Sequence, residues 1–162
     1  MLCLGLSGSG KSTLLAQLVG ENTANIVPTD GFNIKTLPIN GIVLSIKELG
    51  GSERVQTFWT NYYDDKHALI FVVDSSSSDS SLQESINTLR KILSNQSFRK
   101  RPCMVLGTHK DKPQARTHQQ MEDHFREVLL DHEWALVCCS AFDRHSIQNA
   151  MCSLSSLINV FP

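Results

Sequence analysis

The chain has 162 residues and a formal net charge of −1, with 41% hydrophobic and 19% charged residues. This composition is typical of a globular domain of ordinary size, so we expect one domain over residues 1–162. The near-zero charge argues against a nucleic-acid-binding protein that depends on a basic surface. No apolar run approaches the roughly 20 residues that a transmembrane helix needs.

Apolar patterning predicts alternating strands and helices. Runs of strand length lie at 2–4, 32–39, 42–46, 68–74, 103–107 and 134–139. Helical spacing of apolar residues lies at 13–19, 82–93, 121–130 and 147–160. Asn40-Gly41 between the second and third runs indicates a β-hairpin. We expect a short irregular helix within 53–63 and a serine-rich loop at 75–81.

This order predicts an α/β fold, because helices alternate with strands after the hairpin. We expect three layers, with a six-stranded and mostly parallel sheet that carries one antiparallel edge strand and has helices on both faces. Ligands of such sheets bind beyond the carboxyl ends of the strands. The loop after the first strand, Asp74 and the loop after Gly107 should therefore lie close together.

The strongest motif runs from Gly5 to Ser12 and fits G-x-x-x-x-G-K-[ST], a phosphate-binding loop between a strand and a helix. Its glycines let backbone N–H groups turn toward a phosphate, and the N-terminus of the following helix attracts the same anion. We expect Lys11 to reach the β- and γ-phosphates and the Ser12 hydroxyl to ligate Mg²⁺. The expected nucleotide contacts here are Ser7, Gly8, Ser9, Gly10, Lys11, Ser12 and Thr13.

A phosphate-binding loop is shared by kinases, ATPases and GTPases, and two further stretches bear on the γ-phosphate. Thr29 follows the first helix and a loop, where its hydroxyl can supply a second ligand to Mg²⁺. Glu48 comes just before a glycine pair, so its carboxylate can hold a Mg²⁺-bound water. The Gly51 N–H can then be offered to the γ-phosphate.

Two other stretches fit a guanine base. Thr108 and His109 open the sequence T-H-K-D after a buried strand. The Asp111 carboxylate that closes it can accept both N–H groups on the Watson–Crick edge of guanine. Ser140 and Ala141 follow the last strand, and a backbone N–H there can donate to guanine O6 and reject adenine.

These motifs and their spacing resemble the Ras-superfamily small GTPases and, within them, the ADP-ribosylation-factor-like branch. The marks of the branch are P-T-D-G-F-N at 28–33, the glycine pair at 50–51 and W-T-N-Y-Y at 59–63. The resemblance covers essentially the whole chain. It implies a P-loop small-GTPase fold, binding of GTP or GDP with Mg²⁺, and a molecular switch in signalling or trafficking.

The chain departs from the family pattern at residues that promote hydrolysis. The family usually has aspartate where this chain has Glu48, whose extra methylene moves the carboxylate. Ser52 stands where the family has the glutamine that orients the attacking water, and a serine is too short for that reach. We therefore predict slow or impaired GTP hydrolysis and assign no catalytic residue. His109 replaces a lysine that usually lies over the base, so we expect guanine specificity with reduced affinity.

Two other interpretations stay open. A pseudo-GTPase would keep the fold as a binding module or scaffold and would neither cycle nor hydrolyse GTP. The departures at Glu48, Ser52, His109 and Lys47 favour it. A small-molecule P-loop kinase would need neither the hairpin ending in Gly-Gly nor the T-H-K-D motif.

The resemblance also implies an effector surface with an aromatic triad. Phe32 and Tyr62 match two of its positions, and Lys47 stands where the family has tryptophan. Partners that recognise the usual triad should bind poorly, so we expect a distinct set of protein effectors, with an exchange factor in addition. The resemblance further implies membrane-associated partners, including cytosolic domains of membrane magnesium-transport mediators.

Cysteine usage and the start of the chain bear on location. The five cysteines are odd in number and none has C-x-x-C spacing, which favours reduced thiols in the cytoplasm. The first strand has only a few residues before the phosphate-binding loop, so we expect a missing N-terminal extension. Such a segment would place the protein at membranes.

Overall fold

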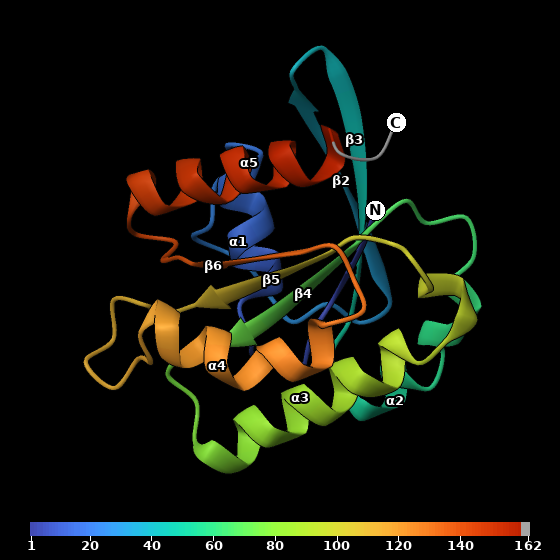
Figure 1. Ribbon diagram of the computed structural model, residues 1–162. Coiled ribbons are helices and arrows are strands. Elements are labelled where there is room, and N and C mark those ends of the chain that lie inside the picture. Colours follow the sequence, from blue (N-terminus) through green and yellow to red (C-terminus); the bar gives the residue numbers. More distant parts are fainter. Residues whose placement is uncertain (160–162) are drawn as a thin grey trace.

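A six-stranded sheet with helices on both faces forms the centre of the computed structural model, which describes residues 1–159 (Figure 1). Its strand order is β2-β3-β1-β4-β5-β6. Only the edge pair β2 and β3 is antiparallel, and the other neighbours are parallel. The strands are β1 (Leu2–Leu4), β2 (Phe32–Ile39), β3 (Ile42–Leu49), β4 (Leu69–Asp74), β5 (Cys103–Thr108) and β6 (Trp134–Cys138). The predicted α/β class and sheet are confirmed.

The helices form the two outer layers (Figure 1). On one face lie α1 (Lys11–Leu18) and α5 (Arg144–Asn159). On the other lie α2 (Glu53–Gln56), α3 (Asp79–Leu93) and α4 (His118–Leu129), with the short 3₁₀ helices η1 (Trp59–Tyr62) and η2 (Gln96–Phe98). In the described part of the chain, no helix is both long and apolar enough to cross a lipid bilayer.

Strand β4 lies in the middle of the sheet, which explains its unbroken apolar sequence. Leu69, Phe71 and Val73 pack into the core under α3 and α4. Ile70 and Val72 point the other way, into the core under α1 and α5. Alternate side chains of a strand face opposite sides, so a strand covered on both faces must be apolar at every position.

The predicted hairpin between β2 and β3 is confirmed. Its turn residues Asn40 and Gly41 have φ angles of 49° and 81°. Positive φ at both central positions is the geometry of the type I′ turn, whose twist suits a two-residue hairpin. The register pairs Ile39 with Ile42 and continues to the pair of Phe32 and Leu49.

Several predicted boundaries were wrong because capping residues lie outside the apolar pattern. The predicted loop 75–81 runs into α3, which begins at Asp79 after Ser78 accepts a hydrogen bond from the Ser81 N–H at 3.3 Å. Helix α4 begins at His118 after a capping box, three residues before the prediction. Helix α5 begins at Arg144 rather than at 147, and its predicted end at 160 lies outside the described residues.

Strand β3 also differs from its prediction, since it runs to Leu49 instead of ending at 46. The extra residues pair with β2 on one side, and Lys47 and Glu48 pair with β1 on the other. Glutamate rarely lies inside a sheet, so its presence concealed the end of the strand. The extension matters for function because it carries Glu48 into the sheet beside the phosphate-binding loop.

Candidate functional site

The loop that follows β1 borders a cleft of about 550 Å³ at the carboxyl ends of the strands. The cleft is lined by Ser7, Gly8, Gly10, Lys11, Ser12, Thr13, Ile26, Val27, Pro28, Thr29, Asp30, Glu48, Gly50, Gly51, Ser52 and His109. Segments far apart in the sequence therefore meet there, as the strand order predicts. Ser9, Thr108, Asp111, Ser140 and Ala141 do not line this cleft.

Lys11 lies inside the phosphate-binding loop and is only 6% exposed. Its Nζ atom donates hydrogen bonds to the carbonyl oxygens of Gly5 and Leu6, each at 2.9 Å. Burial lowers the pKa of Lys11, and the nearby Cys3 and Glu48 oppose that shift. Carbonyls solvate an ammonium group only in part, so a cation held in this way fits an anionic ligand such as a phosphate.

Three oxygen-bearing side chains meet next to Lys11. The Ser12 hydroxyl donates to Glu48 Oε1 at 2.5 Å and lies 3.1 Å from Thr29 Oγ1. The Thr29 hydroxyl lies 3.5 Å from the same carboxylate oxygen. Glu48 is fully buried, and its Oε2 atom has no hydrogen-bond partner among the described residues. Hydroxyl and carboxylate oxygens with an unsatisfied acceptor fit a hard cation such as Mg²⁺.

The glycine pair at the end of β3 holds two loops against each other. A Cβ atom on Gly50 would lie 2.2 Å from the Thr29 carbonyl oxygen, and one on Gly51 would lie 2.4 Å from the Gly5 carbonyl oxygen. No other residue fits at either position without a backbone shift. The Gly51 carbonyl also accepts a hydrogen bond from the Ser7 N–H at 3.1 Å.

Ser52 has a structural role in addition to its place at the cleft. It is the N-cap of α2, where its hydroxyl accepts from the Val55 N–H at 3.4 Å. Serine is among the residues preferred at this position. Gln56, one turn later, donates from Nε2 to the Gly51 carbonyl at 2.8 Å. The nearest glutamine is therefore engaged with the backbone next to the cleft.

Thr108 joins the phosphate-binding loop to the sheet. Its hydroxyl lies 2.7 Å from the Ser9 carbonyl oxygen and 3.2 Å from the Val73 carbonyl oxygen. Thr108 is 5% exposed and ends β5, next to the end of β4. The threonine in T-H-K-D therefore connects two strand ends and the loop.

His109 turns toward the phosphate-binding loop with a φ of 58°. Its Nδ1 atom lies 3.1 Å from Asp74 Oδ1, and its ring borders Gly10. Burial alone would raise the pKa of Asp74, but hydrogen bonds from Ser76 and the His109 charge hold it below its usual value. The ring is thus placed by Asp74 and lines the cleft.

Two of the expected base contacts, Asp111 and Ser140, lie next to each other. The Ser140 hydroxyl lowers the pKa of the Asp111 carboxyl by hydrogen bonding to it. The Ser140 N–H donates to Ser146 Oγ at 3.0 Å, so a base at this position would meet the Ala141 N–H instead. The ion pair of Lys110 and Asp143 at 2.5 Å lies beside them.

The three predicted effector residues also come together. Lys47 Nζ lies 4.9 Å from the ring centroid of Phe32 and 5.0 Å from that of Tyr62. The two ring centroids are 6.2 Å apart. These distances are within the range of cation–π interactions, so the lysine fills the space between the rings.

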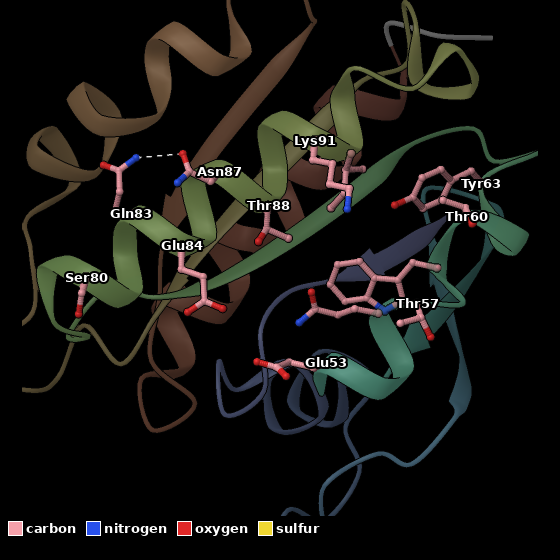
Figure 2. A pocket seen from close by; sticks show the side chains of 13 residues that line it. Glu53, Thr57, Thr60, Tyr63, Ser80, Gln83, Glu84, Asn87, Thr88 and Lys91 are labelled. Carbon is pink, nitrogen blue, oxygen red and sulfur yellow. Dashed lines mark hydrogen bonds between the residues drawn. The ribbon is translucent and has the colours of Figure 1, made fainter.

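A larger cavity, of about 770 Å³, lies away from the phosphate-binding loop (Figure 2). It runs between α3 and the segment from α2 to η1. Figure 2 shows Glu53 and Thr57 on one side and Glu84, Asn87 and Lys91 on the other. Its lining includes none of the predicted nucleotide contacts, so size alone does not identify the functional site.

The sequence assigned no contact to three residues that hold the glycine pair and His109, although it placed Asp74 at this end of the sheet. Trp59 donates from Nε1 to the Gly50 carbonyl at 3.0 Å, Gln56 donates to Gly51, and Asp74 orients His109. Trp59 lies in a stretch that marks the branch, and Asp74 ends a predicted strand. Only Gln56 carries no signal in the sequence, because its role depends on the helical turn that starts at Ser52.

Comparisons with known proteins agree with this geometry. The model of the ADP-ribosylation factor family matches residues 1–158. The chain belongs to this family. It is 37% identical over 162 residues to ADP-ribosylation factor-like protein 15 of Mus musculus, an alignment that covers 99% of this chain and 78% of the relative. The protein of the same name from Homo sapiens is 36% identical with the same coverage.

A more distant relative and a solved structure extend the comparison. ADP-ribosylation factor-like protein 3 of Caenorhabditis elegans is 31% identical over 159 residues, which cover 96% of this chain and 85% of the relative. The Arl6 BBS3 small GTPase from Trypanosoma brucei, solved with the bound nucleotide analogue GppNp, superimposes with a TM-score of 0.80 at 22% identity. It covers 96% of this chain and 95% of that one. The predicted branch and small-GTPase fold are confirmed.

Proposed function

We propose that this Arf-like chain is a guanine-nucleotide-dependent switch that acts by binding protein effectors. The observation that carries the proposal is the buried group of Lys11, Ser12, Thr29 and Glu48 beside a phosphate-binding loop. Membership of the ADP-ribosylation factor family supports guanine nucleotide as the ligand. The bound nucleotide analogue of the Arl6 structure belongs to that protein and agrees with it.

The chain's own residues divide the work of binding. Lys11 would hold the β- and γ-phosphates, with N–H groups of residues 7–13 around them. The oxygens of Ser12 and Thr29 would ligate Mg²⁺, and Glu48 would accept from its bound water. Bound Mg²⁺ neutralises part of the phosphate charge. Asp111 would select guanine at the other end of the site.

Switching would depend on the contacts of the glycine pair. Gly50 packs against Thr29 and Gly51 against the phosphate-binding loop, so a γ-phosphate that draws Thr29 and the Gly51 N–H inward would tighten both contacts. Its loss would release both loops and the hairpin between them. To change the ratio of two conformations from 1:99 to 99:1, the ligand must bind one of them more tightly than the other by about 5.5 kcal/mol.

We infer that hydrolysis is slow, because Ser52 caps α2 and Gln56 is bound to the Gly51 carbonyl. Single-turnover hydrolysis of GTP by the wild-type chain and by Ser52→Gln would test this. We expect a very low wild-type rate and a faster variant. Fast wild-type turnover would contradict the inference.

Nucleotide analysis decides between the switch and its alternatives. The purified protein is denatured and the released nucleotide identified, and thermal stability is measured with added GTP and Mg²⁺. Bound GDP or GTP supports the switch. A pseudo-GTPase scaffold that binds no nucleotide would release none and would not be stabilised by GTP. Released adenine nucleotide would favour a P-loop kinase.

Location and partners follow from the same family membership. We propose a cytoplasmic protein of one domain that binds protein effectors and an exchange factor. Its proposed partners include cytosolic domains of membrane magnesium-transport mediators. All five cysteines are free thiols, which supports a reducing compartment. Co-sedimentation with vesicles, and binding assays with such domains, would test the two parts separately.

A further inference from the structure

One face of the β2–β3 hairpin is largely exposed in the described chain, and the 3₁₀ helix η1 contacts it at Phe32 and Lys47. The register brings eight side chains to this side of the hairpin, of which Leu49 is buried in the core under α3 and α4. The other seven form the hairpin face: Phe32, Ile34, Thr36, Pro38, Val43, Ser45 and Lys47. Six of them are exposed and Lys47 is half-buried. The opposite face packs through Leu37 and Ile46 onto the core under α1 and α5. In Figure 1 the hairpin extends beyond the layer of α2, α3 and α4.

Lys47 is the only charged residue of the hairpin face. Its ammonium group is held between Phe32 and Tyr62, at 4.9 and 5.0 Å from the ring centroids. Among the ion pairs of the described residues, none includes Lys47, whereas the neighbouring Arg54 is paired with Asp30 at 2.7 Å. The rings hold the cation in place but leave it without a counter-charge.

A hollow of about 450 Å³ adjoins the hairpin face, and its lining is apolar except for the ion pair of Asp30 and Arg54. Its lining includes Leu49, Phe58 and Tyr62, and it shares Tyr62 with the group around Lys47. Phe58 is 56% exposed and Phe32 is 54% exposed. A site for an apolar side chain therefore lies next to a fixed cation.

We propose that the hairpin face binds a protein segment that places a carboxylate on Lys47 and an adjacent apolar side chain in the hollow. A wholly apolar partner would remove water from the ammonium group without replacing the hydrogen bonds that the water made. The rings compensate for part of this loss, and a carboxylate supplies the rest. Lys47 thus selects against partners that suit an uncharged aromatic residue at its position. The proposal deepens the proposed function, because the hairpin joins the Thr29 loop to Gly50.

Charge favours a protein segment over two other occupants. Recognition of an anionic membrane surface typically takes a cluster of about 4–8 lysines and arginines, and the hairpin face has one. A second copy of this chain would bring another Lys47 and no carboxylate, since the face carries none. Like charges would then lie close together.

A selection of displayed peptides tests the proposal. The full chain, loaded with a non-hydrolysable GTP analogue, is used to select from a library of random linear peptides. We expect selected peptides to carry Asp or Glu next to a large apolar residue. Their affinity should fall about tenfold or more with Lys47→Met, and similarly when the peptide acid is replaced by its amide. Lys47→Arg should retain binding.

The matched control is Lys35→Met, which removes the same charge from the opposite face of β2, where Lys35 pairs with Glu21. It should change affinity by less than about twofold. Neutral selected peptides, no selected peptides, or binding to phosphatidylserine vesicles that depends on Lys47 would each overturn the proposal. Equal binding with and without nucleotide would contradict the switch and leave the role of Lys47 intact.

Discussion

The two ends of the candidate site, which we propose to bind the phosphates (the phosphate end) and the base (the base end), differ in how deeply their charged side chains lie. At the phosphate end Lys11 is 6% exposed and Glu48 is fully buried. At the base end Lys110 and Asp111 are exposed, and Phe142 beside them is 88% exposed. The first group is hydrogen-bonded into the core, whereas the second lies on surface loops.

We therefore expect changes at the phosphate end to affect nucleotide affinity and changes at the base end to affect the choice of base. Residues of the phosphate end are held by their own contacts, so changes there should alter both folding and nucleotide affinity. Asp111 at the base end is exposed, so changing it should alter the proposed base specificity and leave stability nearly unchanged, whereas Thr108 and Ser140 beside it are buried. Ser52, which follows Gly51 at the phosphate end, lines the cleft and is the N-cap of α2. Four changes test this division, and the largest effect is expected at the phosphate end.

Replacing Lys11 with alanine should remove nucleotide binding. A hydrogen bond to a charged group contributes about 1.5–3 kcal/mol, so losing those to two phosphates predicts a loss of about 100-fold or more in affinity. Titration with a fluorescent GTP analogue measures it. Lys91→Ala, an exposed lysine on α3, is the control and should bind normally. Normal binding by Lys11→Ala would show that the loop is not the phosphate site.

Replacing Asp111 with asparagine should change which base is bound. An amide cannot accept both N–H groups of guanine, but its NH₂ can donate to the 2-oxo group of xanthine. We expect GTP affinity to fall about 10- to 100-fold and XTP affinity to rise. Competition binding measures both. Asp131→Asn, at an exposed position, is the control. Unchanged GTP preference would place the base elsewhere.

Replacing Glu48 with glutamine should raise the stability of the nucleotide-free protein and lower the stabilisation that Mg²⁺ adds to the nucleotide complex. Oε2 is buried without a partner, so a neutral amide should stabilise the nucleotide-free protein by about 1–3 kcal/mol. The extra stabilisation that Mg²⁺ gives to the nucleotide complex should fall. Thermal melts with and without Mg²⁺ and GTP show both effects. Glu53→Gln is the exposed control. A destabilised apo variant with a normal Mg²⁺ response would contradict this assignment.

The smallest effect is expected from Asp74→Asn, which removes the charged partner of His109. The pKa of Asp74 is lowered in the folded protein, so its carboxylate stabilises the fold above its unfolded value of about 3.9. That contribution is lost as the pH falls through the lower folded value. We expect a decrease of about 1–3 °C in Tm at pH 7, which shrinks below about pH 4. A Tm difference between the wild type and Asp74→Asn that grows as the pH falls would contradict this assignment.

The sequence predicted the sheet, and most residues that line the cleft lie in motifs it identified, because both depend on local patterns. The phosphate-binding loop, the Asn40-Gly41 turn and the apolar run of β4 each follow from the residues themselves. The start of α3 could not be predicted from apolar spacing, since Asp79 and its cap Ser78 are polar. The hydrogen bond from Gln56 to the Gly51 carbonyl could not be predicted either, because it requires both the cap at Ser52 and the helical turn that follows.

By itself, the sequence determined the α/β order, the family and the candidate nucleotide-binding motifs. It also showed the departures at Ser52, His109 and Lys47, because each stands at a fixed spacing within a motif. Only the tertiary structure decided what these residues contact. Ser52 caps a helix, His109 pairs with Asp74, and Lys47 lies between two aromatic rings. The cap of Ser52 is local, but the contacts of His109 and Lys47 join segments whose approach is set by packing of the sheet and its helices, which spacing along the chain does not encode.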